Sequence, residues 1–101
     1  MENINIEPTI SERLKNYLEK FHCGEENAVS AADIRKSFGL NPRQIRFIVS
    51  NLRIAGEPIC SGKTGYYFAS CKSEVVKTQN LMFAQAASLM DAATGMGKYL
   101  S

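Results

Sequence analysis

The chain has 101 residues, of which 45% are hydrophobic and 22% are charged, and its formal net charge is +2. This length allows one small domain with a single modest core, and the composition is typical of a soluble globular protein. No apolar run reaches the roughly 18 residues that a membrane-spanning helix needs, so we expect no membrane partner and a cytoplasmic, nucleoid-associated location.

Charge is distributed unevenly along the chain. Residues 1–27 carry six acidic and three basic side chains, residues 28–73 carry two acidic and seven basic ones, and residues 74–101 carry two of each. The net charges are therefore −3, +5 and 0. A local excess of positive charge is expected on a surface that meets phosphates, although a solvated surface without a partner would also explain it.

The first helix is predicted from its capping residues. Residues 1–8 are expected to form a loose arm. Thr9 and Glu12 have the spacing of a capping box, and the helix that follows is expected to end near Phe21. Its apolar residues recur at helical spacing and are expected to face the core: Ile10, Leu14, Tyr17, Leu18 and Phe21.

A short strand and a second helix come next. Ala28 and Val29 are expected to form a very short strand that pairs with a later hairpin. Ser30 and Asp33 form a second capping-box pattern, which begins a helix that runs to about Phe38. The residues of this helix expected to turn inward are Ala31, Ile34 and Phe38.

The turn after Phe38 carries the strongest signal. Gly39 stands where a helix needs a left-handed residue just past its end, and Leu40 is the apolar residue that often closes such a cap. Asn41 can cap the next helix, and Pro42 suits its first position. A turn of about three residues between helices is the spacing of a helix-turn-helix.

The next helix has two different faces. Its core stripe consists of Ile45, Ile48, Val49 and Leu52. The opposite side carries Arg43, Arg46, Phe47, Ser50 and Asn51, with Arg53 on its flank.

A hairpin is predicted after this helix. Gly56 ends the helix, and Pro58 favours an extended chain. Residues 59–61 and 66–69 are the expected strands, and residues 62–65, with Lys63 projecting, form the tip. The tip resembles the end of a phosphate-binding loop, but Glu57 stands where that loop needs glycine, so nucleotide hydrolysis is not expected.

A last helix is expected from Glu74 to about Thr94, capped by Ser73 and ended by Gly95, with residues 96–101 poorly ordered. One broad face is apolar, which favours pairing with a second copy in a two-fold dimer. Packing entirely within its own monomer is the alternative. The residues expected to form the dimer contact are Val75, Met82, Phe83, Ala86, Leu89 and Met90.

Neither an enzyme nor a metal protein is indicated. The three cysteines match no disulfide framework, and we expect reduced thiols. A zinc site can be drawn from His22, Cys23, Cys60 and Cys71, but it lacks the paired spacing of such sites. No triad or Cys/His arrangement has a recognisable spacing, so we expect no catalysis and no cofactor.

The order of elements is that of a winged helix-turn-helix. We expect a mainly α fold with a small β-hairpin: a three-helix core, a two- or three-stranded wing and an appended C-terminal helix. The winged-helix domain would span residues 1–73, with the helix-turn-helix at 30–55 and the wing at 58–69, while residues 74–101 would form the C-terminal helix and tail. Residues 29–69 resemble the winged-helix DNA-binding domains of bacterial and phage regulators, including the biotin-operon repressor type.

The resemblance implies double-stranded DNA as the partner and a role as a small transcriptional regulator or a phage or prophage DNA-associated protein. It places the helix after Asn41 in the major groove, the wing tip against the backbone or minor groove, and the preceding helix near phosphates. The residues implied in DNA contact are Arg35, Lys36, Asn41, Arg43, Gln44, Arg46, Phe47, Ser50, Asn51, Lys63 and Thr64. A protein-interaction module without DNA binding is the alternative, because Phe47 and Ile54 are apolar and expected to point outward. Coverage of Ile54 by the wing strands would weaken this alternative.

Overall fold

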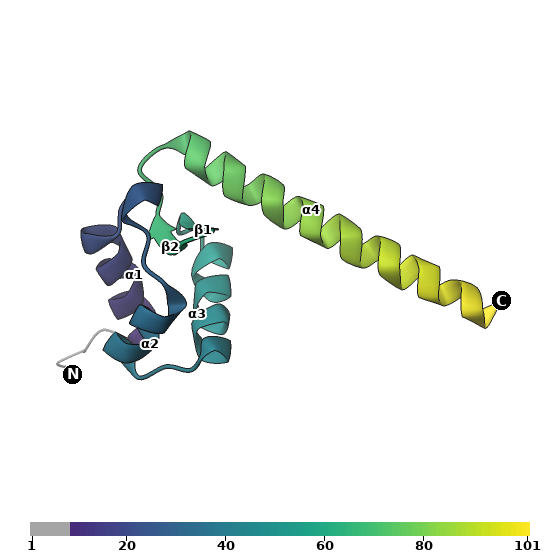
Figure 1. The fold of residues 1–101 in the computed structure, drawn as a ribbon, viewed down its shortest axis with the longest axis horizontal. Coiled ribbons are helices and arrows are strands. Elements are labelled where there is room, and N and C mark those ends of the chain that lie inside the picture. The colour runs from purple at the N-terminus through teal and green to yellow at the C-terminus, as the bar shows by residue number, and fades with distance from the viewer. Residues whose placement is uncertain (1–8) are drawn as a thin grey trace, which may run out of the picture.

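The computed structural model describes residues 9–101, so the arm expected for residues 1–8 lies outside the described residues. Three helices are followed by a two-stranded antiparallel hairpin and a long helix, and a short 3₁₀ turn follows both the first helix and the last one. The first three helices and the hairpin form a body, which α4 leaves at an angle (Figure 1). The elements are α1 (Ile10–Phe21), η1 (Glu25–Asn27), α2 (Ala31–Phe38), α3 (Pro42–Ile54), β1 (Ile59–Gly62), β2 (Gly65–Phe68), α4 (Lys72–Gly97) and η2 (Lys98–Leu100). Three helices followed by a hairpin give a winged-helix-like arrangement.

The predicted caps set the helix starts. At α1, Glu12 N donates to Thr9 Oγ1 at 3.1 Å and Thr9 N donates to Glu12 Oε1 at 2.8 Å, which completes the capping box. At α2, only the first half of the predicted box is formed, because Ser30 Oγ accepts from Asp33 N at 3.1 Å without a reciprocal bond from the Asp33 side chain. Gly39 ends α2 in the left-handed conformation, with φ of 67°, as its position predicted.

The core lies where α1, α2, α3 and the hairpin meet. Its buried members are Leu14, Leu18, Val29, Ile34, Ile45, Ile48, Val49, Leu52 and Ile59. Two residues expected to face inward do not. Phe21 is exposed at the last residue of α1, where its ring lies beside Tyr17 and Lys20, and Ala31 is exposed in the first turn of α2.

The hairpin is tied to the body by Val29, which pairs with it as predicted but as a single bridge rather than as the expected strand of Ala28 and Val29. Val29 N donates to Tyr66 O and Tyr66 N donates to Val29 O, both at 2.9 Å, so residue 29 pairs with β2 as an isolated bridge. Gly62 pairs with Gly65, which leaves Lys63 and Thr64 as a two-residue turn rather than the expected four-residue tip. Tyr67 is 1% exposed, so the alternation of β2 sends this ring into the body.

The course of α4 corrects two predictions. The helix begins at Lys72 with Cys71 in the N-cap position, so Ser73 is not the cap. It also continues through Gly95 to Gly97, and Lys98–Leu100 form η2, so residues 96–100 are helical rather than poorly ordered. A glycine ends a helix when it turns left-handed, whereas Gly95 has no positive φ here, so the helix continues through it.

Glu74 fixes the start of α4 against the body. Its carboxylate accepts from Glu25 N at 2.9 Å, from Ser70 N at 2.8 Å and from Ser70 Oγ at 3.0 Å. These bonds, foremost the one from Ser70 N, hold the pKa of the Glu74 carboxyl below its usual value. The first turn of α4 is therefore held to the loop between α1 and α2 as well as to the hairpin.

Candidate nucleic-acid interface

Helix α3 separates its residues into a buried and an exposed face, as its periodicity predicted. Ile45, Ile48, Val49 and Leu52 are buried. The face turned to solvent presents Arg43, Gln44, Arg46, Phe47, Ser50, Asn51 and Ile54, all of them exposed. A helix that buries one face in the body and leaves the other accessible can be inserted into a groove as a rigid unit.

The first turn of α3 is held by a complete capping box. Gln44 N donates to Asn41 Oδ1 at 2.8 Å, and Asn41 N donates to Gln44 Oε1 at 2.9 Å. Both side-chain oxygens are therefore engaged with the backbone. The amide NH₂ groups of Asn41 and Gln44 are the parts that can still donate to a partner.

Basic groups gather at the turn between α2 and α3. Arg35 and Lys36 lie in the last turn of α2, Arg43 and Arg46 lie in the first turns of α3, and all four are exposed. Helix α3 contains no acidic residue. Within residues 9–101 the ion pairs join Lys15 to Glu19 and Glu57, and Lys77 to Glu25, so none of them neutralises this basic group.

Arg53 has a structural role that the sequence did not reveal. Its Nε donates to Ile59 O at 2.7 Å and its Nη2 donates to Ser61 Oγ at 3.1 Å, so it ties the end of α3 to β1. Burial lowers the pKa of its guanidinium. The helical phase placed Arg53 on the flank of the exposed face, and no short-range pattern indicated that a strand would follow it there.

The hairpin tip borders a groove whose lining includes none of the basic residues at the α2–α3 turn. Lys63 and Thr64 border a groove between the hairpin, η1 and α4, together with Glu25, Glu26, Arg53, Ser61, Gly62, Glu74, Lys77, Thr78, Leu81, Met82 and Gln85. Three carboxylates thus line the same groove as Lys63. The structure brings together the predicted residues of α2 and α3, while the two predicted wing residues have acidic neighbours.

Comparison with known protein families, with curated proteins and with solved structures finds no match to this chain.

In the described residues, 9–101, no helix is long and apolar enough to cross a membrane. Over the same span no group of three or more His, Cys, Asp or Glu side chains could hold a metal ion. Cys60 is buried while Cys23 and Cys71 are exposed, and all three are free thiols.

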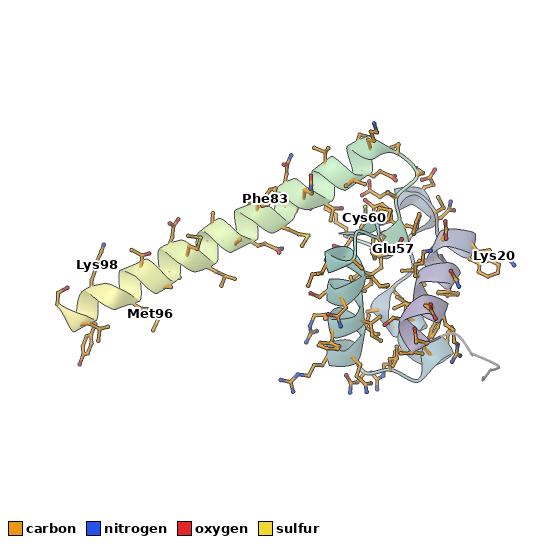
Figure 2. The ribbon with its side chains drawn as sticks, turned by 180° about the vertical axis from the view of Figure 1, so that it is seen from behind. Lys20, Glu57, Cys60, Phe83, Met96 and Lys98 are labelled. Carbon is orange, nitrogen blue, oxygen red and sulfur yellow. The ribbon has the colours of Figure 1, made fainter. Side chains whose placement is uncertain are left out.

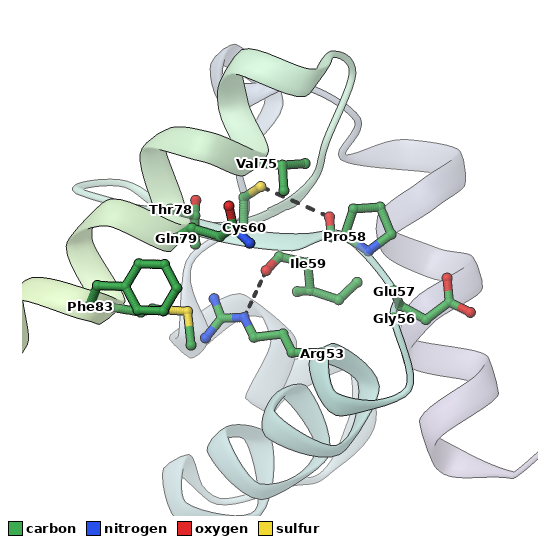
Figure 3. A pocket seen from close by; sticks show the side chains of 11 residues that line it. Arg53, Gly56, Glu57, Pro58, Ile59, Cys60, Val75, Thr78, Gln79 and Phe83 are labelled. Atoms are coloured by element: carbon green, nitrogen blue, oxygen red, sulfur yellow. Dashed lines mark hydrogen bonds between the residues drawn. The ribbon is translucent and has the colours of Figure 1, made fainter. Parts of the chain in front are cut away.

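A cavity of about 360 Å³ lies at the root of α4, between this helix, β1 and the end of α3 (Figure 3). Its lining consists of Arg53, Gly56, Glu57, Pro58, Ile59, Cys60, Val75, Thr78, Gln79, Met82 and Phe83. Thr78 is 5% exposed, and its hydroxyl has no hydrogen-bond partner among the described residues. The Cys60 thiol approaches Glu74 O at 3.6 Å, and burial raises its pKa. We name this the α4-root cavity.

Beyond the cavity, α4 leaves its apolar face uncovered. Figure 2 shows Phe83, Met96 and Lys98 on the part of the helix that extends away from the body. Leu89 is 72% and Met90 is 70% exposed, so packing within the monomer does not cover the predicted dimer residues. Val75 differs from the others of that set, because it is half-buried at the α4-root cavity.

Proposed function

We propose that this chain binds double-stranded DNA as a winged helix-turn-helix protein of the type found in bacterial and phage regulators. Helix α3 would enter the major groove, and the protein would act in the cytoplasm, with the nucleoid, as a small transcriptional regulator or another phage or prophage DNA-associated protein. The proposal includes a homodimer formed through α4. It does not assign an operator or a direction of regulation.

The exposed face of α3 supports this proposal most strongly. It carries Arg43, Arg46, Ser50 and Asn51 on a helix that contains no acidic residue and whose start and buried face are held in place. Arginine suits guanine, and asparagine suits adenine, because each can form paired hydrogen bonds with the base edge in the major groove. The NH₂ groups left by the Asn41–Gln44 capping box can donate to phosphate oxygens.

The residues of α2 and of the hairpin have supporting roles in the proposal. Arg35 and Lys36 would contact phosphates on either side of the groove. Lys63 and Thr64 would contribute less, since their groove holds the three carboxylates Glu25, Glu26 and Glu74 beside the three cations Arg53, Lys63 and Lys77. It therefore has no net positive charge to attract a phosphate. Phe47 would pack against a thymine methyl group.

The test is binding of the purified chain to a mixed pool of double-stranded DNA at two salt concentrations. We compare the native chain with the Arg43→Ala/Arg46→Ala variant and with a Lys20→Ala/Lys98→Ala variant. The control removes the same charge from surfaces outside the proposed interface. Each lost arginine contact should cost about 1–3 kcal/mol, and the slope of log affinity against log salt should fall by roughly 0.9 for each lost phosphate contact.

The results that support or contradict DNA binding are distinct. A steep salt dependence, enrichment of a palindromic site and loss of affinity in the arginine variant alone would support the proposal. Equal affinity of the two variants would contradict the role given to α3. Absence of binding by the native chain at low salt would refute DNA binding itself.

A protein-interaction module is the second candidate, and one observation favours it. Phe47 is 67% and Ile54 is 81% exposed, and they lie two turns apart on the same side of α3. The hairpin does not cover Ile54. If native DNA binding is absent, a protein partner that contacts Phe47 becomes the better explanation, since an exposed aromatic and an aliphatic residue on one line form a protein contact.

A further inference from the structure

The apolar face of α4 continues without charge from the body to the end of the helix. At 100° per residue, the face that starts at Val75 includes Gln79, Met82, Phe83, Ala86, Leu89, Met90, Ala93, Met96, Gly97 and Leu100. The charged residues Lys77, Asp91 and Lys98 project from the other side. From residue 86 onward the residues of this face are exposed, apart from Gly97, which is partly buried.

The body lies on the same side of α4 as this apolar face. Val75, Gln79, Met82 and Phe83 belong to the face and also line the α4-root cavity, whose opposite wall is made by β1 and the end of α3. If two copies paired these faces in parallel, both bodies would lie at the same end of the helix pair. Each body would then lie on the side where the other copy packs, and the two would collide. Antiparallel pairing places the two bodies at opposite ends.

We propose that two copies of the chain pair their α4 helices antiparallel, with Leu100 of each copy seated in the α4-root cavity of the other. The proposal rests on the α4 dimer of the proposed function and adds its orientation, its register and the occupant of the cavity. In an isologous two-fold contact, if residue i meets residue j then j also meets i. We call each pair of facing residues a layer, and in the proposed register the two residue numbers of every layer add up to 179.

This register pairs side chains of complementary size. Its layers are Gln79 with Leu100, Met82 with Gly97, Phe83 with Met96, Ala86 with Ala93, and Leu89 with Met90. Alanine faces alanine on both sides of the two-fold axis, so the backbones can approach closely there. Met82 meets a residue without a side chain, and Met96 places its sulfur beside the Phe83 ring, a favourable contact.

Neighbouring registers do not fit the cavity. Moving the partner by one heptad toward the body would place Leu100 opposite Lys72, beyond the cavity, where the hairpin already packs. Moving it one heptad the other way would place Leu100 opposite Ala86 and leave the cavity empty. Residues 79 and 100 are separated by about 30 Å of helix, which is the span over which the two helices overlap.

The area available is sufficient for a stable dimer. Six large apolar side chains on the face, Met82, Phe83, Leu89, Met90, Met96 and Leu100, are exposed, the last of them 86%. Each removes on the order of 100 Å² from water when covered, which gives about 600 Å² per chain. With Gln79 and the small residues added, the contact approaches the roughly 800 Å² per partner of a standard interface.

Orientation is tested by disulfide trapping in the full chain with Cys23, Cys60 and Cys71 replaced by serine. Phe83→Cys and Met96→Cys are made singly, checked for helical content, and oxidised alone and as a mixture. Antiparallel pairing in the proposed register should link the mixture and neither variant by itself. A parallel pair would link Phe83→Cys to itself, and that result would overturn the proposal.

Occupancy of the cavity is tested by Leu100→Asp in the native chain, with Ala84→Asp as the matched control. Ala84 is exposed, and at 100° per residue it lies on the opposite side of α4 from Val75, so it should tolerate the charge. Sedimentation without DNA should show the dissociation constant rising at least tenfold for Leu100→Asp alone. We expect the native chain to be a dimer at about 100 µM. A native chain that stays monomeric at this concentration would overturn the proposal, and so would a dimer that Leu100→Asp does not weaken. Since no DNA is present, either failure leaves the DNA-binding result unchanged.

Discussion

The attachment of the hairpin to the body depends on Gly65. Its φ is +138°, and a Cβ at this position would lie 2.0 Å from the carbonyl oxygen of Val29 and 2.5 Å from the carbonyl carbon. Backbone atoms cannot move aside as a flexible side chain can. A Gly65→Ala variant must therefore separate Val29 from β2 or distort the turn.

The expected cost follows from these contacts. Separation breaks the two 2.9 Å hydrogen bonds between Val29 and Tyr66, each worth about 0.5–1.5 kcal/mol. The alternative is a strained backbone, which costs about 1–3 kcal/mol for a side chain in a sparsely populated conformation. Either route gives a similar cost, so we expect Gly65→Ala to lower the free energy of unfolding by about 1–3 kcal/mol, a substantial share of the roughly 5–15 kcal/mol typical of a domain.

Gly62, on the other side of the same turn, provides the matched control. Its φ is not positive, and an added Cβ would lie 3.2 Å from the Glu25 carboxylate and 4.0 Å from the Tyr67 ring, the latter an ordinary van der Waals contact. Displacing that carboxylate weakens an exposed ion pair with Lys77, which is worth at most about 1 kcal/mol. Urea unfolding followed by circular dichroism gives both values. If the two variants lie within 0.5 kcal/mol of each other, about the error of such a comparison, the close approach of Gly65 to Val29 does not hold the hairpin in place.

Two further predictions concern the helix caps and the thiols. Asn41→Asp should keep the stability of α3 within about 0.5 kcal/mol, because Asp caps as well as Asn, yet it should weaken DNA binding several-fold by placing a carboxylate beside Arg43. Ser30→Asp, which adds the same charge at the start of α2, should leave DNA affinity nearly unchanged, and equal weakening by both would show that α3 is not the contact. Cys71 should be alkylated faster than Cys60 at neutral pH, since the Ser73 hydroxyl, 3.1 Å away, lowers the pKa of the Cys71 thiol while burial raises that of Cys60. We expect Ser73→Ala to shift the alkylation of Cys71 to higher pH. Mass spectrometry of the labelled peptides measures this pH profile, and an unchanged profile would show that the hydrogen bond has no effect.

The candidate site was only partly readable from the sequence. The exposed and buried faces of α3 follow from helical spacing, so Arg43, Arg46 and Phe47 could be placed before the structure was known. Arg53 could not, because its role depends on β1, whose position is set by the whole body. Lys63 was correctly placed at the tip, but the acidic side chains beside it come from η1 and α4, which are distant in the sequence.

The sequence alone determined the local structure of this protein. The capping residues Thr9, Ser30, Asn41 and Gly39 act through bonds to residues three or four positions away. Their patterns therefore determined where the first three helices begin and where α2 ends. Only the tertiary structure decided the path of α4. Its departure from the body depends on bonds that Glu74 makes to Ser70 and to the distant Glu25, and the α4-root cavity exists because of that angle. An apolar stripe indicates that a helix face must be covered. The folded body determines which part of that face lies against the body and which part is left for a partner.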